Sequence, residues 1–297
     1  MKWLMWIGVI IGVAVMVAVT LRVVGAIRWA DLMRAHAGQL EAARVDGNDR
    51  FSSTAIPSSP ARFDARELEG LPAPVQRYFR AVLKDGQLII AAATIKLAGT
   101  INMSATGEQW KPFTSQQRVV TRRPGFLWNA QIDMFPGLPV RVEDSYIAGQ
   151  GQLIAKLLGL FTVASARGSG EMARGEFMRY FAEAAWYPTA LLPSQGVRWA
   201  AVDSNSAMAT IVDGPISLSM LFRFNEAGLI ASVRAESRGA GVGKDMVMLP
   251  WDCGLSDYQS QHGMLLPMTG EAAWVQPEGR KPYFVGKVTS LRYEFLP

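Results

Sequence analysis

The stretch that decides the fold is Ile216–Phe224, ISLSMLFRF, followed by Asn225–Gly228, NEAG, and Leu229–Glu236, LIASVRAE. In the first run, large apolar residues occupy every second position, and two serines and an arginine lie among the residues between them. Because neighbouring side chains of a strand point to opposite faces, this alternation predicts a strand with one buried face. The second run alternates in the same way, and Gly228 supplies the positive φ that a short turn needs. These residues predict an antiparallel hairpin.

The same period of two recurs along the chain. The C-terminal run Val285–Leu296 alternates, and further strands are expected at Ala93–Met103, Gln117–Thr121, Phe126–Asp133, Val140–Ala148, Val197–Val202, Ala207–Val212 and Leu265–Val275. Ten strands joined by short connections favour an antiparallel meander over βαβ crossovers. Helices are expected at Leu71–Gly86, Gln152–Leu160 and Glu171–Ala185. We therefore expect a mainly β (α+β) domain: a curved antiparallel sheet or incomplete β-barrel with a few covering helices.

Composition narrows the function classes. Hydrophobic residues make up 49% and charged residues 19% of the 297 positions, which excludes a disordered chain. The net charge of +5 favours anionic partners such as phospholipid head groups. The basic residues are scattered, so no nucleic acid is expected as a partner. Cys253 is the single cysteine and His36 and His262 are the two histidines, so we expect no metal, no cofactor and no thiol enzyme.

The N-terminal segment Trp3–Leu21 contains nineteen residues without a charge. As a helix it is roughly 28 Å long, which matches the hydrocarbon thickness of a bilayer. We expect an uncleaved transmembrane anchor. The alternative is a cleaved signal peptide with Lys2 before the apolar run and a cleavage site at 24–26, but the run exceeds the ~7–15 residues of such peptides.

The expected organisation has three parts. Residues 1–25 form the anchor, residues 26–65 a helical extension and a Ser/Pro-rich tether, and residues 66–297 a single β-rich domain. Gly8 and Gly12 form a GxxxG pair that predicts a weak homodimer between membrane helices. The flanking charges leave the orientation of the anchor open.

Several long motifs carry a resemblance to a known family. They are LPAPVQRYF (71–79), RPGFLWNAQIDMFPGLPVRVEDSY (123–146), GEFMRYFAEAAWYPTALLPSQGVRW (175–199), FRFNEAGLIASVRAE (222–236) and GRKPYFVGKVTSLRYEF (279–295). From about Leu71 to its C-terminus, the chain resembles an uncharacterised bacterial family, a domain of unknown function with an N-terminal membrane segment. That family has no established activity, so the resemblance implies no reaction.

A second resemblance is architectural. RRPGFLWNAQI (122–132) and FRFNEAGLIASVRAE (222–236) are similar to parts of the periplasmic lipoprotein-carrier and lipoprotein-receptor proteins. Those proteins are incomplete antiparallel barrels, closed by helices, that hold acyl chains in the hollow. The resemblance implies a lipid-binding domain outside the cytoplasm. Together with the N-terminal anchor, this predicts a single-pass protein of the bacterial inner membrane.

The candidate site lies in EFMRYFAEAAWYPTALLPS (176–194). On a helix, Glu176, Arg179 and Glu183 share one face. A surface ion-pair ladder is favoured over a catalytic acid/base pair, because the two carboxyls would lie about 10 Å apart along the helix axis. In the strand VRVEDSY, Arg141 and Glu143 are likewise expected to form a solvent-facing pair, with Asp144 on the other face.

The kinked segment that follows supplies the ligand-contacting residues. Two prolines bracket two leucines, which predicts an apolar loop at the mouth of the sheet. Packing into the core is the alternative for this loop. Candidate ligand contacts, with no catalytic residue among them, are Trp186, Tyr187, Leu191, Leu192, Trp128 and Phe222.

These observations favour a membrane-anchored, non-catalytic envelope protein whose curved sheet binds a lipid or other hydrophobic ligand. Two alternatives stay open at this point: a structural or protein-interaction module with a self-filled core, and a hydrolase that uses Glu176 and Glu183.

Overall fold

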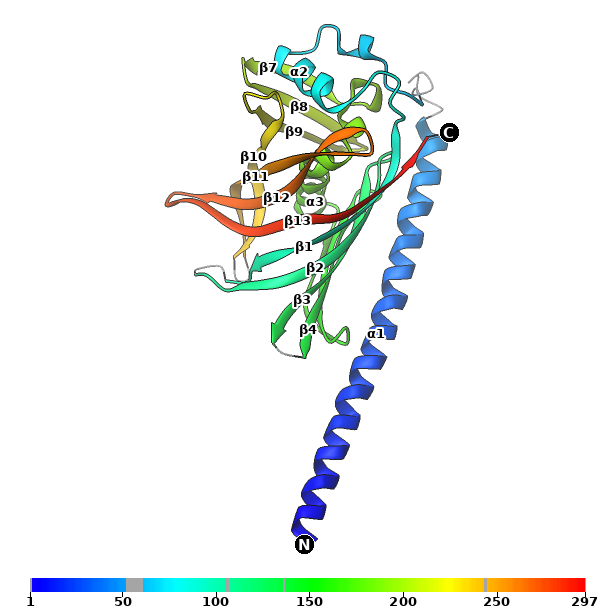
Figure 1. Cartoon of the computed structure of the whole chain (residues 1–297), viewed down its shortest axis with the longest axis vertical. Helices are drawn as coiled ribbons and strands as arrows, with labels where there is room; N and C mark the ends of the chain where they lie inside the picture. Colours follow the sequence, from blue (N-terminus) through cyan, green and yellow to red (C-terminus); the bar gives the residue numbers. More distant parts are fainter. Residues whose placement is uncertain (1, 52–60, 105–106, 136, 243–244, 297) are drawn as a thin grey trace.

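The computed structural model describes residues 2–51, 61–104, 107–135, 137–242 and 245–296. Helix α1 (Lys2–Phe51) runs alongside a β-rich globular part, and its N-terminal half projects beyond it (Figure 1). The strands form one antiparallel sheet of thirteen in the described residues, three more than predicted. The sheet is open, because its edge strands β6 and β7 are not paired with each other.

The sheet consists of two meanders that meet in the middle. Strands β1 to β6 follow one another in space, as do β7 to β13, and β1 pairs with β13. The bounds are β1 Ile90–Asn102, β2 Trp110–Val120, β3 Gly125–Phe135, β4 Leu138–Ile147, β5 Gln150–Leu157, β6 Phe161–Gly168, β7 Arg198–Asp203, β8 Ser206–Asp213, β9 Ile216–Phe224, β10 Ile230–Val242, β11 Asp245–Gln261, β12 Met264–Gln276 and β13 Gly279–Phe295.

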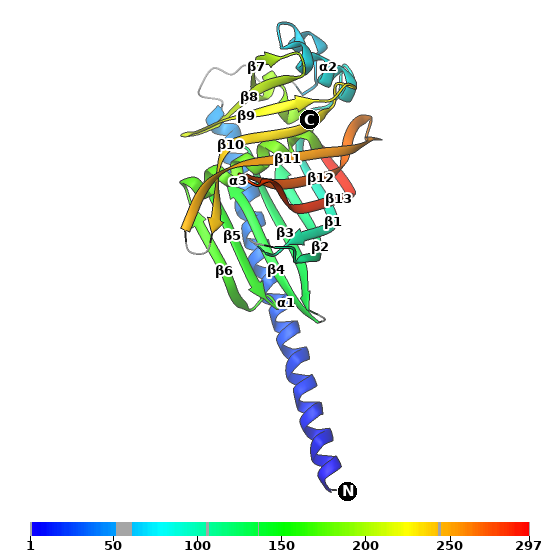
Figure 2. The ribbon, with the colours of Figure 1, turned by 90° about the vertical axis from the view of Figure 1, so that its left-hand side faces the viewer.

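One connection joins the two edges and lies inside the curve of the sheet. It consists of helix α3 (Glu171–Ala182) and the 3₁₀ turns η2 (Glu183–Trp186), η3 (Pro188–Leu191) and η4 (Pro193–Gln195). Helix α3 contacts β4, β5 and β6 of one meander and β9 and β10 of the other. In Figure 2 it lies between the steeply running first meander and the nearly horizontal strands of the second.

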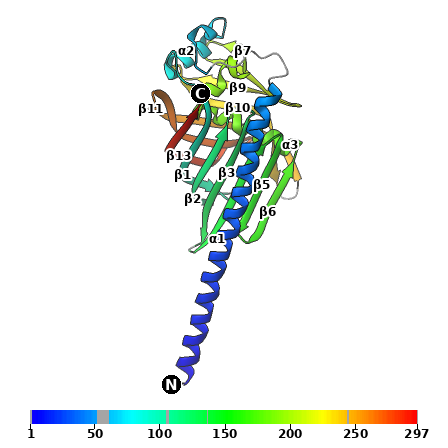
Figure 3. The same cartoon turned by 90° about the vertical axis from the view of Figure 1, so that its right-hand side faces the viewer.

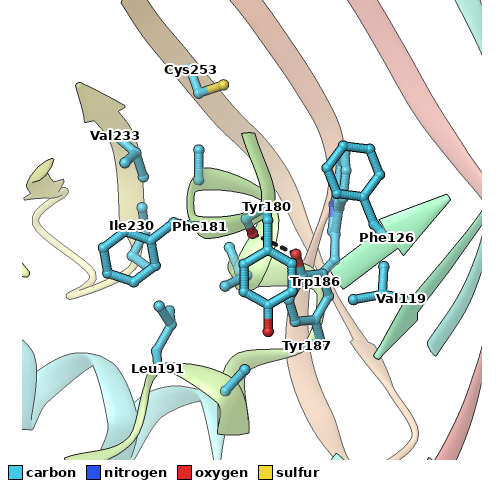
Figure 4. Close-up of a cluster of buried hydrophobic side chains, with 14 of the residues drawn as sticks. Val119, Phe126, Tyr180, Phe181, Trp186, Tyr187, Leu191, Ile230, Val233 and Cys253 are labelled. Carbon is cyan, nitrogen blue, oxygen red and sulfur yellow. Dashed lines mark hydrogen bonds between the residues drawn. The ribbon is translucent and has the colours of Figure 1, made fainter. Parts of the chain in front are cut away.

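Aromatic residues of this connection form the core on the concave face. Phe177, Phe181 and Tyr187 are fully buried, and Tyr187 donates a hydrogen bond of 2.5 Å to the carbonyl oxygen of Tyr180 (Figure 4). At one end, η1 (Ala65–Leu68) and α2 (Ala73–Val82) cover the core; α2 buries the apolar face expected of it. The connection therefore fills much of the hollow with its own side chains.

The C-terminal half of α1 covers the opposite, convex face, against β2, β3 and β4 (Figure 3). Leu40 is buried in a small apolar cluster there, and Trp29 Nε1 donates to Asn129 Oδ1 at 2.9 Å. In the N-terminal half, a Cβ added to Gly8 or Gly12 would have no atom within 4 Å outside the backbone of the helix itself, so the predicted homodimer stays a prediction. Residues 46–51 of the predicted tether continue the helix, and residues 52–60 lie outside the described residues.

The three strands that sequence reasoning missed are β5, β6 and β11. The prediction of a helix at Gln152–Leu160 is wrong, because most of this segment belongs to β5, which pairs with β4 and β6. One face of β5 lies against α3: a Cβ on Gly151 would be 2.6 Å from the Met172 backbone. Short apolar runs of this kind are ambiguous between strand and helix by periodicity alone.

Candidate functional site

A cavity of about 250 Å³ is lined by residues of α3 and η2 on one side and of the concave face of the sheet on the other. Both meanders contribute to its wall. The aromatic lining consists of Trp128, Trp186, Trp251, Trp274, Tyr283 and Phe284, and Ile101, Ile132, Val142, Leu153 and Leu255 supply aliphatic surface. The polar lining is sparse but strongly charged, and three of its side chains come from one face of α3 and η2: Glu176, Arg179 and Glu183.

Arg179 is the most completely bonded of these charged residues. Its guanidinium donates to Glu183 at 2.8 Å, to Asp144 at 2.5 Å and to Gln117 at 3.1 Å. The rings of Phe126 and Trp128 lie 5.0 and 4.8 Å from its central carbon. Burial by itself would lower the pKa of Arg179, but the two carboxylates outweigh it and raise that pKa. Arg179 is therefore a permanent cation whose charge is balanced within the protein.

Glu176 lies one turn earlier and is only 5% exposed. Burial raises its pKa well above the ordinary value, and the neighbouring Asp144 carboxylate raises it further. Glu176 Oε2 and Asp144 Oδ1 are both buried without a hydrogen-bond partner among the described residues, and a hydrogen bond between the two carboxyls would need a proton on one of them. The physical cause favours the proton on Glu176, because Asp144 is the one ion-paired to Arg179.

Arg238 enters the cavity from β10 through a β-bulge. Ala235 pairs with Trp251 but Arg238 pairs with Leu249, so β10 holds one extra residue at this point. Pro250 lies opposite the bulge and has no N–H to donate to the ladder. The extra residue turns Arg238 inward, where its guanidinium stacks 4.3 Å from the Trp251 ring. Among the described residues Arg238 donates no hydrogen bond, and its Nη2 lies 3.6 Å from Glu176 Oε1.

The structure brings two of the six predicted ligand-contacting residues to the cavity. Trp128 and Trp186 line it, and Trp186 is fixed by a hydrogen bond of 2.9 Å from its Nε1 to the carbonyl oxygen of Pro267. The other four, Tyr187, Leu191, Leu192 and Phe222, are fully buried and do not line it. They belong to the packed core beside the cavity, partly visible in Figure 4.

Two expectations about charged residues are wrong. The charged face of α3 is not a surface ladder, because the helix is enclosed between the two meanders and that face meets the cavity. Glu143 is not a solvent-facing partner of Arg141. It is completely buried, and its carboxylate is 2.8 Å from Nδ1 of His36 on α1. Helix α1 covers this face of the sheet, and a strand pattern alone does not show what covers it.

Three residues that line the cavity were not among the predicted ligand contacts: Arg238, Trp251 and Trp274. Strict alternation from Val233 and Ala235 places position 238 on the outer face, and only the bulge reverses this. The signal that could have revealed it is Pro250 inside a strand, because proline within a sheet marks an edge or a bulge.

The structure places Cys253 and His262 far apart. Cys253 is buried in the cavity wall on β11, and burial raises its pKa above the ordinary range. His262 follows the end of that same strand, on the order of 25–30 Å away along an extended chain. In the part of the chain that the structure describes, no group of three or more His, Cys, Asp and Glu residues is arranged to hold a metal ion.

Comparison with known proteins gives a family but no activity. No curated protein matches the chain. A LolA superfamily protein from Nitrosomonas europaea aligns with a TM-score of 0.39 and 9% identity, over 77% of this chain and 96% of that one. A beta-barrel-like protein of the domain of unknown function DUF1849 from Brucella abortus aligns with a TM-score of 0.23 and 9% identity, over 69% of this chain and 98% of that one.

The resemblance drawn from the motifs is confirmed by a family match. The DUF6920 model, described as a family of unknown function, matches residues 69–293, and the chain belongs to this family.

Proposed function

We propose that this protein binds a lipid or another amphipathic, largely apolar ligand in the cavity under α3, without catalysing a reaction on it. In this proposal α1 anchors the chain in the bacterial inner membrane by residues 1–25, and the domain from residue 66 onwards lies outside the cytoplasm. The observation that carries the proposal is the cavity itself, with its aromatic and aliphatic wall drawn from both meanders.

The lining of the cavity supports a ligand. A volume of about 250 Å³ is just below the range of about 300–1,000 Å³ that is usual for small-molecule sites. The wall is predominantly aromatic and aliphatic, and a ligand that covers it removes apolar surface from water, which contributes roughly 25 cal/mol per Å².

The geometry of α1 supports the membrane anchor. An 18-residue window in the N-terminal part of α1 has a mean hydropathy of 2.6, and none of it is buried in the protein. Arg22, directly after the apolar run, donates a hydrogen bond to the carbonyl oxygen of Gly137 in the β3–β4 turn. Phe135 and Leu138, which flank that turn, are exposed, so a bilayer around the apolar run would meet them at its surface.

A photo-crosslinking experiment tests the proposal. The full-length chain is placed in nanodiscs that contain a phospholipid with a diazirine in its acyl chain, and labelled peptides are identified by mass spectrometry. We expect label on α1 and on the cavity-lining peptides around Trp128, Trp186 and Trp251. Label on α1 alone would show that the cavity takes no acyl chain.

A cavity-filling variant provides the matched control. Ala272 lines the cavity, whereas Ala201 on β7 is exposed. We expect Ala272→Leu to abolish the cavity label and to leave the α1 label unchanged, and Ala201→Leu to change neither. The α1 label thus serves as an internal reference for the amount of lipid probe.

A further inference from the structure

Arg238 is the charged side chain of the cavity whose hydrogen-bonding capacity is unused. Its side chain is 9% exposed and its Nε is enclosed without a partner among the described residues. Its guanidinium stacks against Trp251 at 4.3 Å and lies 5.8 Å from the Trp274 ring. Stacking engages the flat face of the group and leaves the N–H donors in its plane available. A buried guanidinium with free donors is costly unless an acceptor reaches it.

The nearest carboxyl accepts no hydrogen bond from Arg238. Glu176 Oε1 lies 3.6 Å from Nη2 of Arg238, which is an ion-pair distance but beyond hydrogen-bond distance, and burial raises the pKa of Glu176 and so disfavours its charged form. The carboxylates of Asp144 and Glu183 are bonded to Arg179 instead. Arg238 is therefore a buried cation from which no carboxylate of the described residues accepts a hydrogen bond.

A second unused donor lies in the same wall. The indole Nε1 of Trp128 is enclosed and has no hydrogen-bond partner among the described residues. By contrast, Nε1 of Trp186 and of Trp251 donate to Pro267 and Tyr283 at 2.9 and 3.0 Å. Buried polar groups in proteins are normally bonded, so unpartnered donors in a cavity wall point to a missing acceptor.

We infer that the ligand of this cavity carries an anionic head group, a carboxylate or a phosphate, that binds the in-plane donors of Arg238. This inference rests on the proposed function and names the chemical class of its ligand. The apolar body of the ligand lies along Trp274, Leu255 and Phe284, and the anion accepts the hydrogen bonds that Arg238 does not make within the described residues. A cationic ligand would be repelled by Arg238, and a neutral ligand would offer at most an uncharged acceptor, whose hydrogen bond to Arg238 is weaker than that of an anion.

Calorimetry with three eight-carbon probes tests this inference on the full-length chain in detergent. Octanoate and octyl phosphate carry the two candidate anions, and octanol has the same chain without charge. Titration into empty micelles supplies the blank. We expect octanoate or octyl phosphate to bind at least roughly tenfold more tightly than octanol, and their ratio distinguishes a carboxylate from a phosphate site.

Substitutions at position 238 attribute the preference to one side chain. We expect Arg238→Met to reduce anion affinity roughly tenfold to a hundredfold and to leave octanol affinity unchanged or higher. Arg238→Lys keeps the charge but loses the planar set of donors that can bind an anion through two parallel hydrogen bonds, so we expect an intermediate anion affinity. Arg234→Met on the same strand is the control, because Arg234 is paired with Glu236 and does not line the cavity.

The outcomes separate the inference from the proposed function. Octanol binding that equals octanoate binding, with no effect of Arg238→Met, would overturn the inference and leave a neutral hydrophobic ligand. If no probe binds and the diazirine label is absent from the cavity, the proposed function fails as well. Circular dichroism of each variant shows whether it is folded, and Arg238→Lys keeps the test decisive if Arg238→Met does not fold.

Discussion

The hydroxyl of Tyr146 on β4 donates a hydrogen bond of 2.6 Å to the carboxylate of Asp213 at the end of β8. In the spatial order of the strands, β4 is third from one edge and β8 is second from the other. The sheet therefore curls until its two ends approach each other. The ring of Tyr146 also stacks at 4.9 Å on Phe177 of α3, so the helix lies within this closure.

Removing that hydroxyl should loosen the closure. Tyr146→Phe keeps the stacked ring but leaves the buried Asp213 carboxylate with Arg123, at 3.6 Å, as its remaining ion-pair partner among the described residues. We expect a loss of about 1.5–3 kcal/mol, the usual contribution of a hydrogen bond to a charged group. Urea unfolding of the full-length chain in detergent, followed by tryptophan fluorescence, measures it. Tyr258→Phe is the matched control: its bond at 2.7 Å is to a neutral carbonyl, so about 1 kcal/mol is expected. Equal losses of stability in the two variants would mean that the hydrogen bond to Asp213 stabilises the fold no more than a hydrogen bond to a neutral carbonyl does.

How far the sequence predicts this fold is visible in particular elements. The hairpin of β9 and β10 was predictable because its two runs alternate and are joined by a short turn with Gly228 at φ 77°. Helix α3 was predictable because its periodicity is helical. Strand β5 was not predictable, because its short apolar run is ambiguous between strand and helix by periodicity alone. The curl that joins Tyr146 to Asp213 depends on contacts 67 positions apart, which no local pattern contains.

The candidate site was predictable to a similar extent. The spacing of Glu176, Arg179 and Glu183 correctly puts them on one face, but spacing does not show whether that face meets water or a cavity. Trp186 was identified because a helix break follows it. The position of Arg238 in the cavity wall was not predictable, because a single extra residue in β10 moves its side chain to the opposite face of the strand.

Arg179 should be essential for the folded state. Arg179→Met removes the partner of two buried carboxylates, and breaking a buried ion pair in this way costs about 3–5 kcal/mol. A lowered urea midpoint in the assay above would show this. The triple variant with Asp144→Asn and Glu183→Gln removes the stranded charges, and we expect it to recover most of the loss. Failure to recover would mean that packing of the long side chain, and not charge, is the main contribution of Arg179.

The raised pKa of Glu176 predicts a dependence of stability on pH. In the unfolded chain this carboxyl ionises near its ordinary pKa of 4.5, while in the folded protein it keeps its proton to higher pH. Between these two values the folded state binds more protons, so the free energy of unfolding contributed by Glu176 falls as the pH rises. It is fully present below pH 4.5 and lost by the folded pKa.

Glu176→Gln isolates this contribution, because glutamine keeps a donor toward Asp144 but does not titrate. We expect the stability of the variant relative to the wild type to increase as the pH rises above about 4.5, and to level off above the folded pKa. The difference is measured by urea unfolding at a series of pH values, so that other titrating groups cancel. A difference that stays constant would show that Glu176 is ionised in the folded protein and is available as a counter-ion for Arg238.

The contact between α1 and the domain depends on a glycine. A Cβ added to Gly25 would be 2.0 Å from the carbonyl oxygen of Leu158, in the turn between β5 and β6. Gly25→Ala must therefore separate the helix from this turn. We expect faster hydrogen–deuterium exchange in the β5–β6 turn and a lower melting temperature of the full-length chain in nanodiscs.

Gly38→Ala is the control on the same helix. A Cβ at that position has no atom within 4 Å, and alanine should stabilise the helix by ~0.5–1 kcal/mol. Unchanged exchange in Gly25→Ala would contradict the close approach of α1 to the sheet. If residues 1–25 anchor the chain as proposed, this approach would also fix the height of the cavity above the membrane, because the apolar run ends at Leu21, four residues before Gly25.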